Sequence, residues 1–349
     1  MVASKYRALV ETSSRLADVD VFDDIDHDTI VDATALLERI RPVLDSVRAM
    51  ELHECVVPVD YKPDFFPHHM DDVQHLRNLS RALRFASDVA AYNEDYRSVA
   101  RFGTVILDLA NAVRRGGLVV DHLVSIAVSG CGVACLRKVR ERFSDDVRRD
   151  LIDSLDRYER EREPFSCVVK RDAEWEAESG YEDDGTELSE EELIDADSEL
   201  PIENQKLLIQ LVKELSNQPK SEKRAMHADQ ERRALAITRL LAVDLAIRCS
   251  HARTERFPNA IAELVPDCLP RLLRDPFSNS DFIYRHGTNS FTLYSTGPDK
   301  TDSGGHFGPW IAVSVGGYDL CLDSEDYSPN CCTIQRPSLA SWIWSRLCF

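Results

Sequence analysis

The spacing at which hydrophobic residues recur along this chain changes near Asp275-Pro276. That change limits the possible folds more than any other feature of the sequence. Before it, a stretch that is apolar on more than one face predicts a long, largely buried helix at about residues 228–256. After it, apolar residues alternate with a period of two on either side of a turn around Gly287, which predicts antiparallel strands at about 281–322. A long helix beside a small antiparallel sheet is therefore expected.

The residues between the helix and the strands include a specific series of helix-ending and turn-forming motifs. Proline disfavours helix in the residue before it, so Phe257-Pro258 is expected to end the helix. Asp275 can cap a turn, Pro276 presets φ for it, and Phe277 can anchor it in the core. The complete signature consists of Phe257, Pro258, Asp275, Pro276, Phe277, Tyr294, Ser295, Gly297 and Pro298.

This signature resembles the globular domain of type II secretion pseudopilins over about residues 231–305. The resemblance implies a helix packed on a small antiparallel sheet, and it implies no reaction. A helical domain followed by such a module is also similar to uncharacterised multi-domain proteins of planctomycete bacteria. The chain lacks the prepilin-peptidase site and the long apolar helix of pseudopilins, so we do not expect it to polymerise or anchor as they do.

Calcium is the one cofactor that the resemblance suggests. Many pseudopilins bind it in the loop after the strand, and the matching loop here offers Asp299, Asp302 and Ser303. Calcium prefers six to eight oxygen ligands, so two carboxylates and a hydroxyl give the site little support. A plain turn rich in Asp and Gly is the alternative, and no other cofactor is expected.

The first 170 residues have a helical period. One set of apolar residues at helical spacing is Leu36, Ile40, Val43, Leu44 and Val47, and similar sets follow towards Tyr158. The connections are short, which predicts antiparallel neighbours in an irregular helical bundle or array. Cys131 and Cys135 share one face with small residues, which favours close helix packing over a redox pair. The expected fold class is therefore α+β, with a mainly α-helical N-terminal domain (1–170) and a C-terminal α+β domain (205–349).

An acidic tract separates these two domains and is expected to form a linker at residues 171–204. Between 172 and 203 there are fifteen Asp or Glu residues and no Lys or Arg, which accounts for all but about −4 of the net charge of −19. High charge with few apolar residues favours a solvated or disordered segment. It also argues against binding nucleic acid, which needs a basic surface.

A loop rich in histidine suggests a different function. His53, Cys55, His68, His69 and His75 are types of residue that bind zinc, and a metal-dependent enzyme could use this loop at 53–75. No recognised spacing fixes their geometry, however. The alternative is a proline-rich loop at 54–69 with surface histidines and a buried Cys55.

No segment reaches the roughly 18 uncharged apolar residues that a membrane helix needs, so no membrane span is expected. The nearest candidate, 122–136, is better explained as a buried helix. The N-terminus lacks the apolar core of a signal peptide, which predicts a cytoplasmic protein. An anchor upstream of this sequence would change that to the cell envelope or periplasm. Four C-terminal cysteines could pair in an oxidising compartment: Cys321, Cys331, Cys332 and Cys348.

The sequence contains no nucleophile elbow, phosphate-binding loop or dinucleotide fingerprint. We therefore expect a non-enzymatic interaction or scaffold protein that carries a pseudopilin-like module and binds a protein partner. The alternatives are the metal-dependent enzyme and a component of the cell envelope related to secretion.

Overall fold

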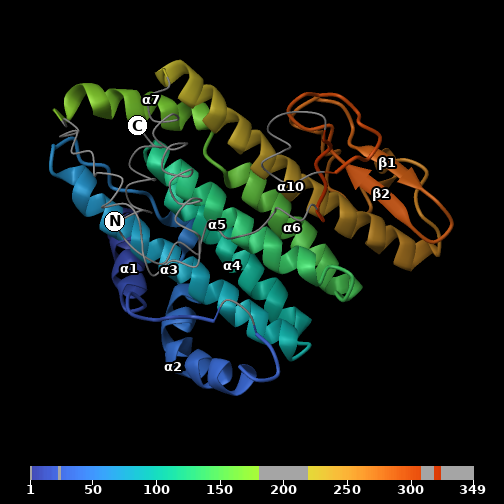
Figure 1. Ribbon diagram of the computed structural model, residues 1–349, viewed down its shortest axis with the longest axis horizontal. Coiled ribbons are helices and arrows are strands. Elements are labelled where there is room, and N and C mark those ends of the chain that lie inside the picture. The colour runs from blue at the N-terminus through green and yellow to red at the C-terminus, as the bar shows by residue number, and fades with distance from the viewer. Residues whose placement is uncertain (1, 23–24, 181–218, 308–317, 324–349) are drawn as a thin grey trace, which may run out of the picture.

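The computed structural model describes residues 2–22, 25–180, 219–307 and 318–323. The described chain is mainly helical, with a two-stranded antiparallel sheet near its C-terminal end (Figure 1). The expected α+β class with a mainly helical N-terminal region is confirmed.

The N-terminal part is a bundle of helices joined by short connections. They are α1 (Val2–Ser14), α2 (Ile30–Arg48), α3 (Phe65–Tyr92), α4 (Tyr96–Arg114), α5 (Val119–Lys138), α6 (Asp145–Glu161) and α7 (Phe165–Glu178), with the 3-10 turn η1 (Leu52–Glu54) before α3. The helix α5 is central, because it contacts α3, α4, α7 and the long C-terminal helix.

Two expected boundaries in this part are wrong. The proline-rich loop is shorter than predicted, since α3 already begins at Phe65. Pro67 lies in the first turn of that helix, where a missing N–H removes no intrahelical hydrogen bond. The helix α7 also continues into the segment expected as an acidic linker, and its Trp175 is buried. The rest of the tract, residues 181–204, lies outside the described residues.

The helices α4 and α5 approach each other closely at two glycines. A Cβ atom on Gly132 would lie 3.1 Å from the carbonyl oxygen of Gly103, and one on Gly103 would lie 2.6 Å from Leu136 Cγ. Cys131 and Cys135 are both buried here, and burial raises the pKa of the Cys135 thiol to about 12. A thiol that resists ionisation supports packing as the role of Cys135.

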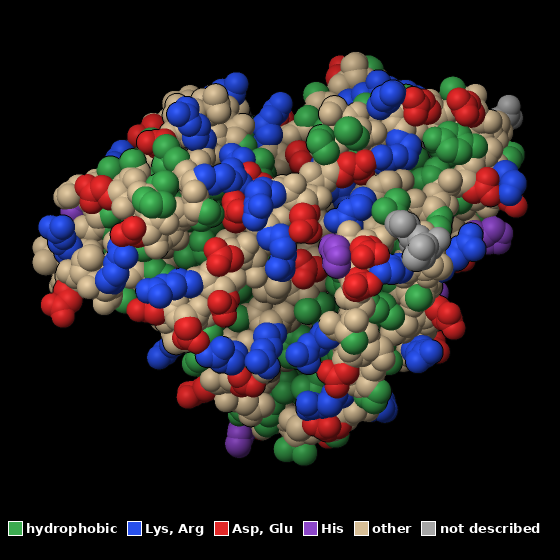
Figure 2. Space-filling model, turned by 180° about the vertical axis from the view of Figure 1, so that it is seen from behind, with side chains coloured by type: hydrophobic (Ala, Val, Ile, Leu, Met, Phe, Trp, Pro, Cys, Tyr) green, Lys and Arg blue, Asp and Glu red, His purple; other side chains and the backbone are tan. Residues whose placement is uncertain are grey.

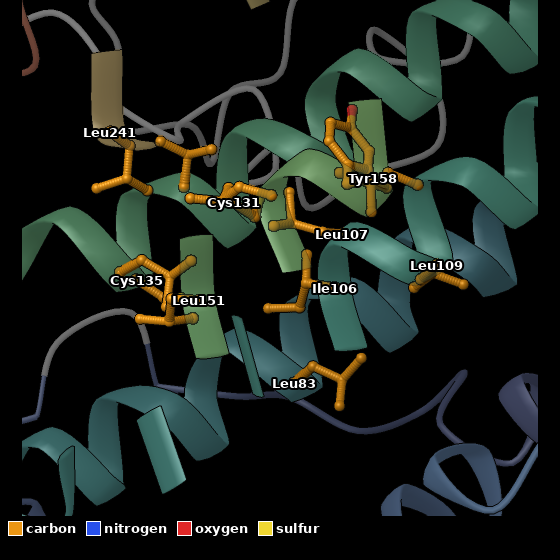
Figure 3. Packing of buried hydrophobic residues seen from close by; sticks show 14 of the residues in the cluster. Leu83, Ile106, Leu107, Leu109, Cys131, Cys135, Leu151, Tyr158 and Leu241 are labelled. Atoms are coloured by element: carbon orange, nitrogen blue, oxygen red, sulfur yellow. The ribbon is translucent and has the colours of Figure 1, made fainter. Parts of the chain in front are cut away.

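The long helix α10 (Lys220–Thr254) starts earlier than the sequence predicts and connects the bundle to the sheet. It packs on α5 and α6 along one side and contacts the second strand on another. This position explains why it is apolar on several faces. Figure 3 shows side chains from α3, α4, α5, α6 and α10 meeting in one core, with Leu83, Ile106, Cys131, Leu151 and Leu241 among them.

The sheet is a hairpin of β1 (Ile283–His286) and β2 (Phe291–Tyr294), preceded by the 3-10 turn η2 (Ile261–Leu264). The predicted turn at Gly287 is present, and its N–H donates to the carbonyl oxygen of Ser290 at 2.8 Å. Beyond β2, Ser295 and Leu320 exchange two backbone hydrogen bonds of 2.9 Å, which brings residues 318–320 beside the hairpin. Residues 308–317 of the expected strand region lie outside the described residues.

One helix among the described residues, α5, is long and apolar enough to cross a membrane. Most of it is buried between other helices, with 89% of its apolar window inside the protein. It is therefore the buried core helix that the sequence predicts for residues 122–136.

Candidate interaction groove and buried polar network

A groove of about 940 Å³ lies between the hairpin and the helices that support it. Its walls come from β2 and the hairpin turn on one side, and from α6, α10 and the loop after α5 on the other. Residues 321–323 close one end of it. Segments far apart in the sequence thus surround one hollow large enough for a ligand.

The helical wall of the groove is lined by arginines that form ion pairs. Arg140 and Arg248 share the buried Asp244, at Nε–Oδ distances of 2.8 and 2.7 Å. Arg248 also contacts Glu141 at 3.1 Å. Arg148 lies beside them and pairs with an aspartate of its own helix. A buried charge is unfavourable unless an opposite charge lies beside it. The buried carboxylate of Asp244 therefore holds the guanidinium groups of Arg140 and Arg248 at this wall.

Aromatic rings form the base of the groove where α10 ends. Phe257 lies with its ring centroid 5.4 Å from that of Phe291, in an edge-to-face arrangement. His251 stacks on Phe257 at 4.3 Å, and the Arg248 guanidinium lies 5.4 Å from the Phe291 ring centroid. This arrangement gives the groove an apolar surface next to its charged wall.

Several signature residues meet around the Asp-Pro-Phe turn. Asp275 is buried and accepts hydrogen bonds from the Phe277 N–H at 3.0 Å and from the Ser295 hydroxyl at 2.9 Å. The Asp-Pro-Phe turn is therefore fixed to the end of β2. Tyr294 is buried, and Gly297 has φ of +71°, as a tight reversal requires.

The helix end differs from the prediction. α10 stops at Thr254, before Phe257-Pro258, where Glu255 takes a left-handed conformation with φ of +60°. Pro258 is buried beyond the helix, and its carbonyl oxygen accepts a hydrogen bond from the Tyr284 hydroxyl at 3.0 Å. Pro298 follows the reversal at Gly297 and is half-buried.

The proposed calcium ligands do not converge in the described structure. Asp302 accepts hydrogen bonds from the Gly304 N–H and the Tyr294 hydroxyl, which lower the pKa of that carboxyl, and it also pairs with Arg285. Asp299 accepts from the Thr301 N–H, and the Ser303 N–H donates to Asp319. Among the described residues, no group of three acidic, His or Cys side chains lies close enough for a metal. This donor set does not fit calcium.

The histidines of the loop at 53–75 also stay apart. His53 and His68 are exposed, while His69 is buried and lies 2.8 Å from Asp121. His75 is half-buried on α3, and Cys55 is buried beneath the loop, where burial raises its pKa. The pair of His69 and Asp121 belongs to a buried polar network rather than to a metal site.

The buried polar network begins where α5 starts. Asp121 accepts a hydrogen bond from the Leu118 N–H at 2.7 Å, and Asp172 of α7 accepts one from the Val119 N–H at 2.9 Å. These bonds satisfy N–H groups that a helix start leaves without intrahelical partners. Burial raises the pKa of Asp172 to about 6. Burial alone would lower the pKa of His69, but the neighbouring Asp121 outweighs it and raises that pKa.

A second part of the network joins α10 to the bundle. The buried Arg114 of α4 binds Glu231 of α10 through two hydrogen bonds of 2.9 and 3.0 Å. Arg162 donates to the same carboxylate at 2.7 Å. His122 lies 3.8 Å from Glu231, and its burial, followed by the nearby Arg114, holds its pKa well below the usual value. Each contact joins α10 to another segment of the bundle, so we assign this network a structural role.

Comparison with protein-family models, with curated proteins and with solved structures finds no match to this chain. The resemblance to pseudopilins therefore stays a prediction.

Sequence reasoning missed the charged residues that form the wall of the groove. Asp244 and Arg248 carried a usable signal, because a charged pair four residues apart interrupts an otherwise apolar helix. Arg140 gave no such signal, since its pairing with Asp244 joins positions 104 residues apart. Cys321 is buried beside the groove, and Cys331, Cys332 and Cys348 lie outside the described residues.

Proposed function

We propose that this protein is a non-enzymatic interaction or scaffold protein whose groove docks a protein partner. The observation that carries the proposal is the hollow of about 940 Å³ between β2 and the arginine-lined helices. It combines an apolar base, charged walls and a strand edge, which are features that protein ligands recognise.

The chemistry of the groove favours binding over catalysis. Its one lining histidine, His251, stacks on Phe257. Among the described residues, neither lining hydroxyl, on Ser290 or Thr292, donates a hydrogen bond to it. A nucleophile activated by a base would need such a contact. The arginines are engaged with carboxylates, which holds the wall in a fixed shape.

One face of the molecule carries mixed charge. Figure 2 shows Lys and Arg side chains interspersed with Asp and Glu across the face seen from behind. That face therefore offers no surface of one charge as an alternative docking site to the groove.

Quantitative affinity purification with the intact chain as bait tests the proposal. Ser290→Trp places a large ring in the groove from an exposed position, and Thr34→Trp makes the same change on the exposed face of α2. We expect Ser290→Trp to lose most of the specifically captured protein and Thr34→Trp to keep it. Equal capture by both variants would contradict a docking site in the groove.

A further inference from the structure

We propose that the groove receives an extended, acidic peptide strand, which pairs with the open edge of β2 and places a carboxylate against Arg248. This inference rests on the proposed docking function and names the kind of partner. It follows from the directions in which the backbone N–H and C=O groups of β2 point, from the position of that edge beside the groove, and from the charges that line the groove.

The hydrogen-bonding pattern of β2 shows which of its two edges is open. Ser295 exchanges both of its hydrogen bonds with Leu320, on the side of the strand away from β1. Backbone groups of alternate residues point to the same edge of a strand, so Phe291 and Leu293 also point away from β1. Gly287 donates to Ser290 on the β1 side, as this alternation requires.

Phe291 and Leu293 have no backbone hydrogen bond on that edge within the described residues. Both residues line the groove. Unpaired strand edges are templates for another extended chain. The edge is ready to accept the main chain of a peptide.

The occupant has to be a single strand. The residues of this edge line a recess whose other wall is formed by α10 and by Arg148 of α6. Among the described residues the pairing with β2 goes no further than Leu320, and Arg137 binds the Leu322 carbonyl oxygen. A folded second copy cannot bring its own sheet edge into such a recess, whereas a short extended segment can.

The charges inside the groove favour an acidic side chain. The side chains of Arg148, Arg140 and Arg248 are only 13%, 15% and 21% exposed. The buried acid among them is Asp244, at 3%. The other acids of the lining, Glu141 and Asp323, are 70% and 66% exposed at the rim.

Ion pairs with such exposed rim groups contribute little, so a peptide carboxylate can replace Glu141 beside Arg248. Within the described part of the chain, Asp244 is the one buried acidic partner of the three arginines, since Asp145, which pairs with Arg148, is 44% exposed like the rim acids. A peptide carboxylate can therefore take the place of a solvated partner. Phe257 and Phe291 offer an apolar surface for a neighbouring side chain of the peptide. The predicted ligand is a strand that carries both an acidic and an apolar residue.

Backbone amide exchange of the intact protein tests the pairing. The probe is the acetylated and amidated hexapeptide Thr-Val-Glu-Val-Thr-Val, and the readout is NMR exchange at residues 291–294. We expect the amides of Phe291 and Leu293 to slow about tenfold, as for a hydrogen bond worth about 1.4 kcal/mol. Those of Thr292 and Tyr294 should not change, because they already face β1.

Several results would overturn the proposal. One is no change at millimolar peptide, and another is equal slowing at all four residues. A third is strong protection of Phe291 and Leu293 before peptide is added, since the edge would then already be covered by the chain itself or by a second copy. The proposal also requires that an analogue of the peptide, N-methylated at alternate residues, binds at least about tenfold more weakly than the peptide itself.

The charge assignment has its own control. Arg248→Gln should weaken binding of the Glu peptide about fivefold to tenfold and leave its Gln analogue unaffected, as for a charge-assisted hydrogen bond. The matched variant Arg160→Gln, on an exposed part of α6, should change neither. Equal affinity of the wild-type protein for the Glu and Gln peptides would contradict an acidic ligand.

The two proposals fail in different ways. If Ser290→Trp abolishes partner capture but the peptide leaves Phe291 and Leu293 unprotected, the strand pairing is wrong and the docking function stands. If the peptide protects those amides while Ser290→Trp still captures partner normally, the groove binds strands but is not the docking site of the partner.

Discussion

At the scale of single residues, buried carboxylates connect the helices of this protein. Asp121 and Asp172 both bind the start of α5, and Glu231 holds Arg114 and Arg162. The sequence suggested other roles: His69 as a metal ligand and Asp172 as part of a solvated tract. Neither partner could be read from sequence, because each contact joins residues more than fifty positions apart.

Asp172→Asn should change how stability depends on pH. The pKa of Asp172 is raised to about 6, above its ordinary value of 3.8, so the folded protein holds this proton more tightly. Its contribution to the free energy of unfolding is therefore greatest below pH about 4 and falls as the pH rises to about 6. Asparagine keeps an acceptor for the Val119 N–H without the buried charge. We expect the variant to be about 1–2 kcal/mol more stable at pH 8, measured by urea unfolding.

Asp146→Asn is the control, because the contribution of Asp146 to stability depends on pH in the opposite direction. Hydrogen bonds from Ser144 and Arg97 lower the pKa of Asp146 to about 2, so its stabilisation is present above pH about 4 and is lost as the pH falls towards 2. Parallel stability curves for Asp172→Asn and the wild-type protein between pH 4 and 8 would contradict the role given to Asp172.

Glu231→Gln should be severely destabilising. It leaves the buried guanidinium of Arg114 and that of Arg162 without their shared counter-charge, which costs about 3–5 kcal/mol. Glu161→Gln, at an exposed position near the end of α6, should stay within about 0.5 kcal/mol of the wild-type protein. Chemical unfolding at pH 7 measures both, and a loss below about 1 kcal/mol for Glu231→Gln would show that the network is dispensable.

At the scale of elements, hydrophobic period predicted most of the helices and the hairpin. It failed where tertiary contacts set the boundary. α10 begins earlier than its apolar run, at Lys220, where Lys220 pairs with Glu176 of α7 and the polar Lys223 and His227 are buried. α7 extends to Glu178 because Trp175 packs near Phe66 and donates to the Asp60 carbonyl oxygen. Local composition cannot report such contacts.

Gly103→Val tests the close packing of α4 on α5. The added side chain meets Leu136 at a distance that real contacts do not allow, so the helices must separate at a cost of about 2–3 kcal/mol. Gly287→Ala has space around its new Cβ atom and should be nearly neutral. Thermal unfolding compares the two, and an equally small effect at both glycines would contradict the contact.

At the scale of the whole molecule, α10 supports both parts of the fold. Its first half is fixed to the bundle by Glu231, and its second half carries the hairpin and, through Asp244, the arginine wall of the groove. The module inferred from sequence is therefore built onto the helical part, with one hydrophobic core running through both. The groove exists only where the two meet, which is why neither segment of sequence revealed it.

The claim that a partner docks in this groove is tested most directly by photo-crosslinking. A benzophenone amino acid replaces Asn289 at the rim of the groove in the intact chain, and the same residue replaces Thr34 on α2 as the control. We expect position 289 alone to label a partner, through a short acidic segment, and Ser290→Trp to remove that labelling. Equal labelling from position 34, or labelling that survives Ser290→Trp, would contradict the account.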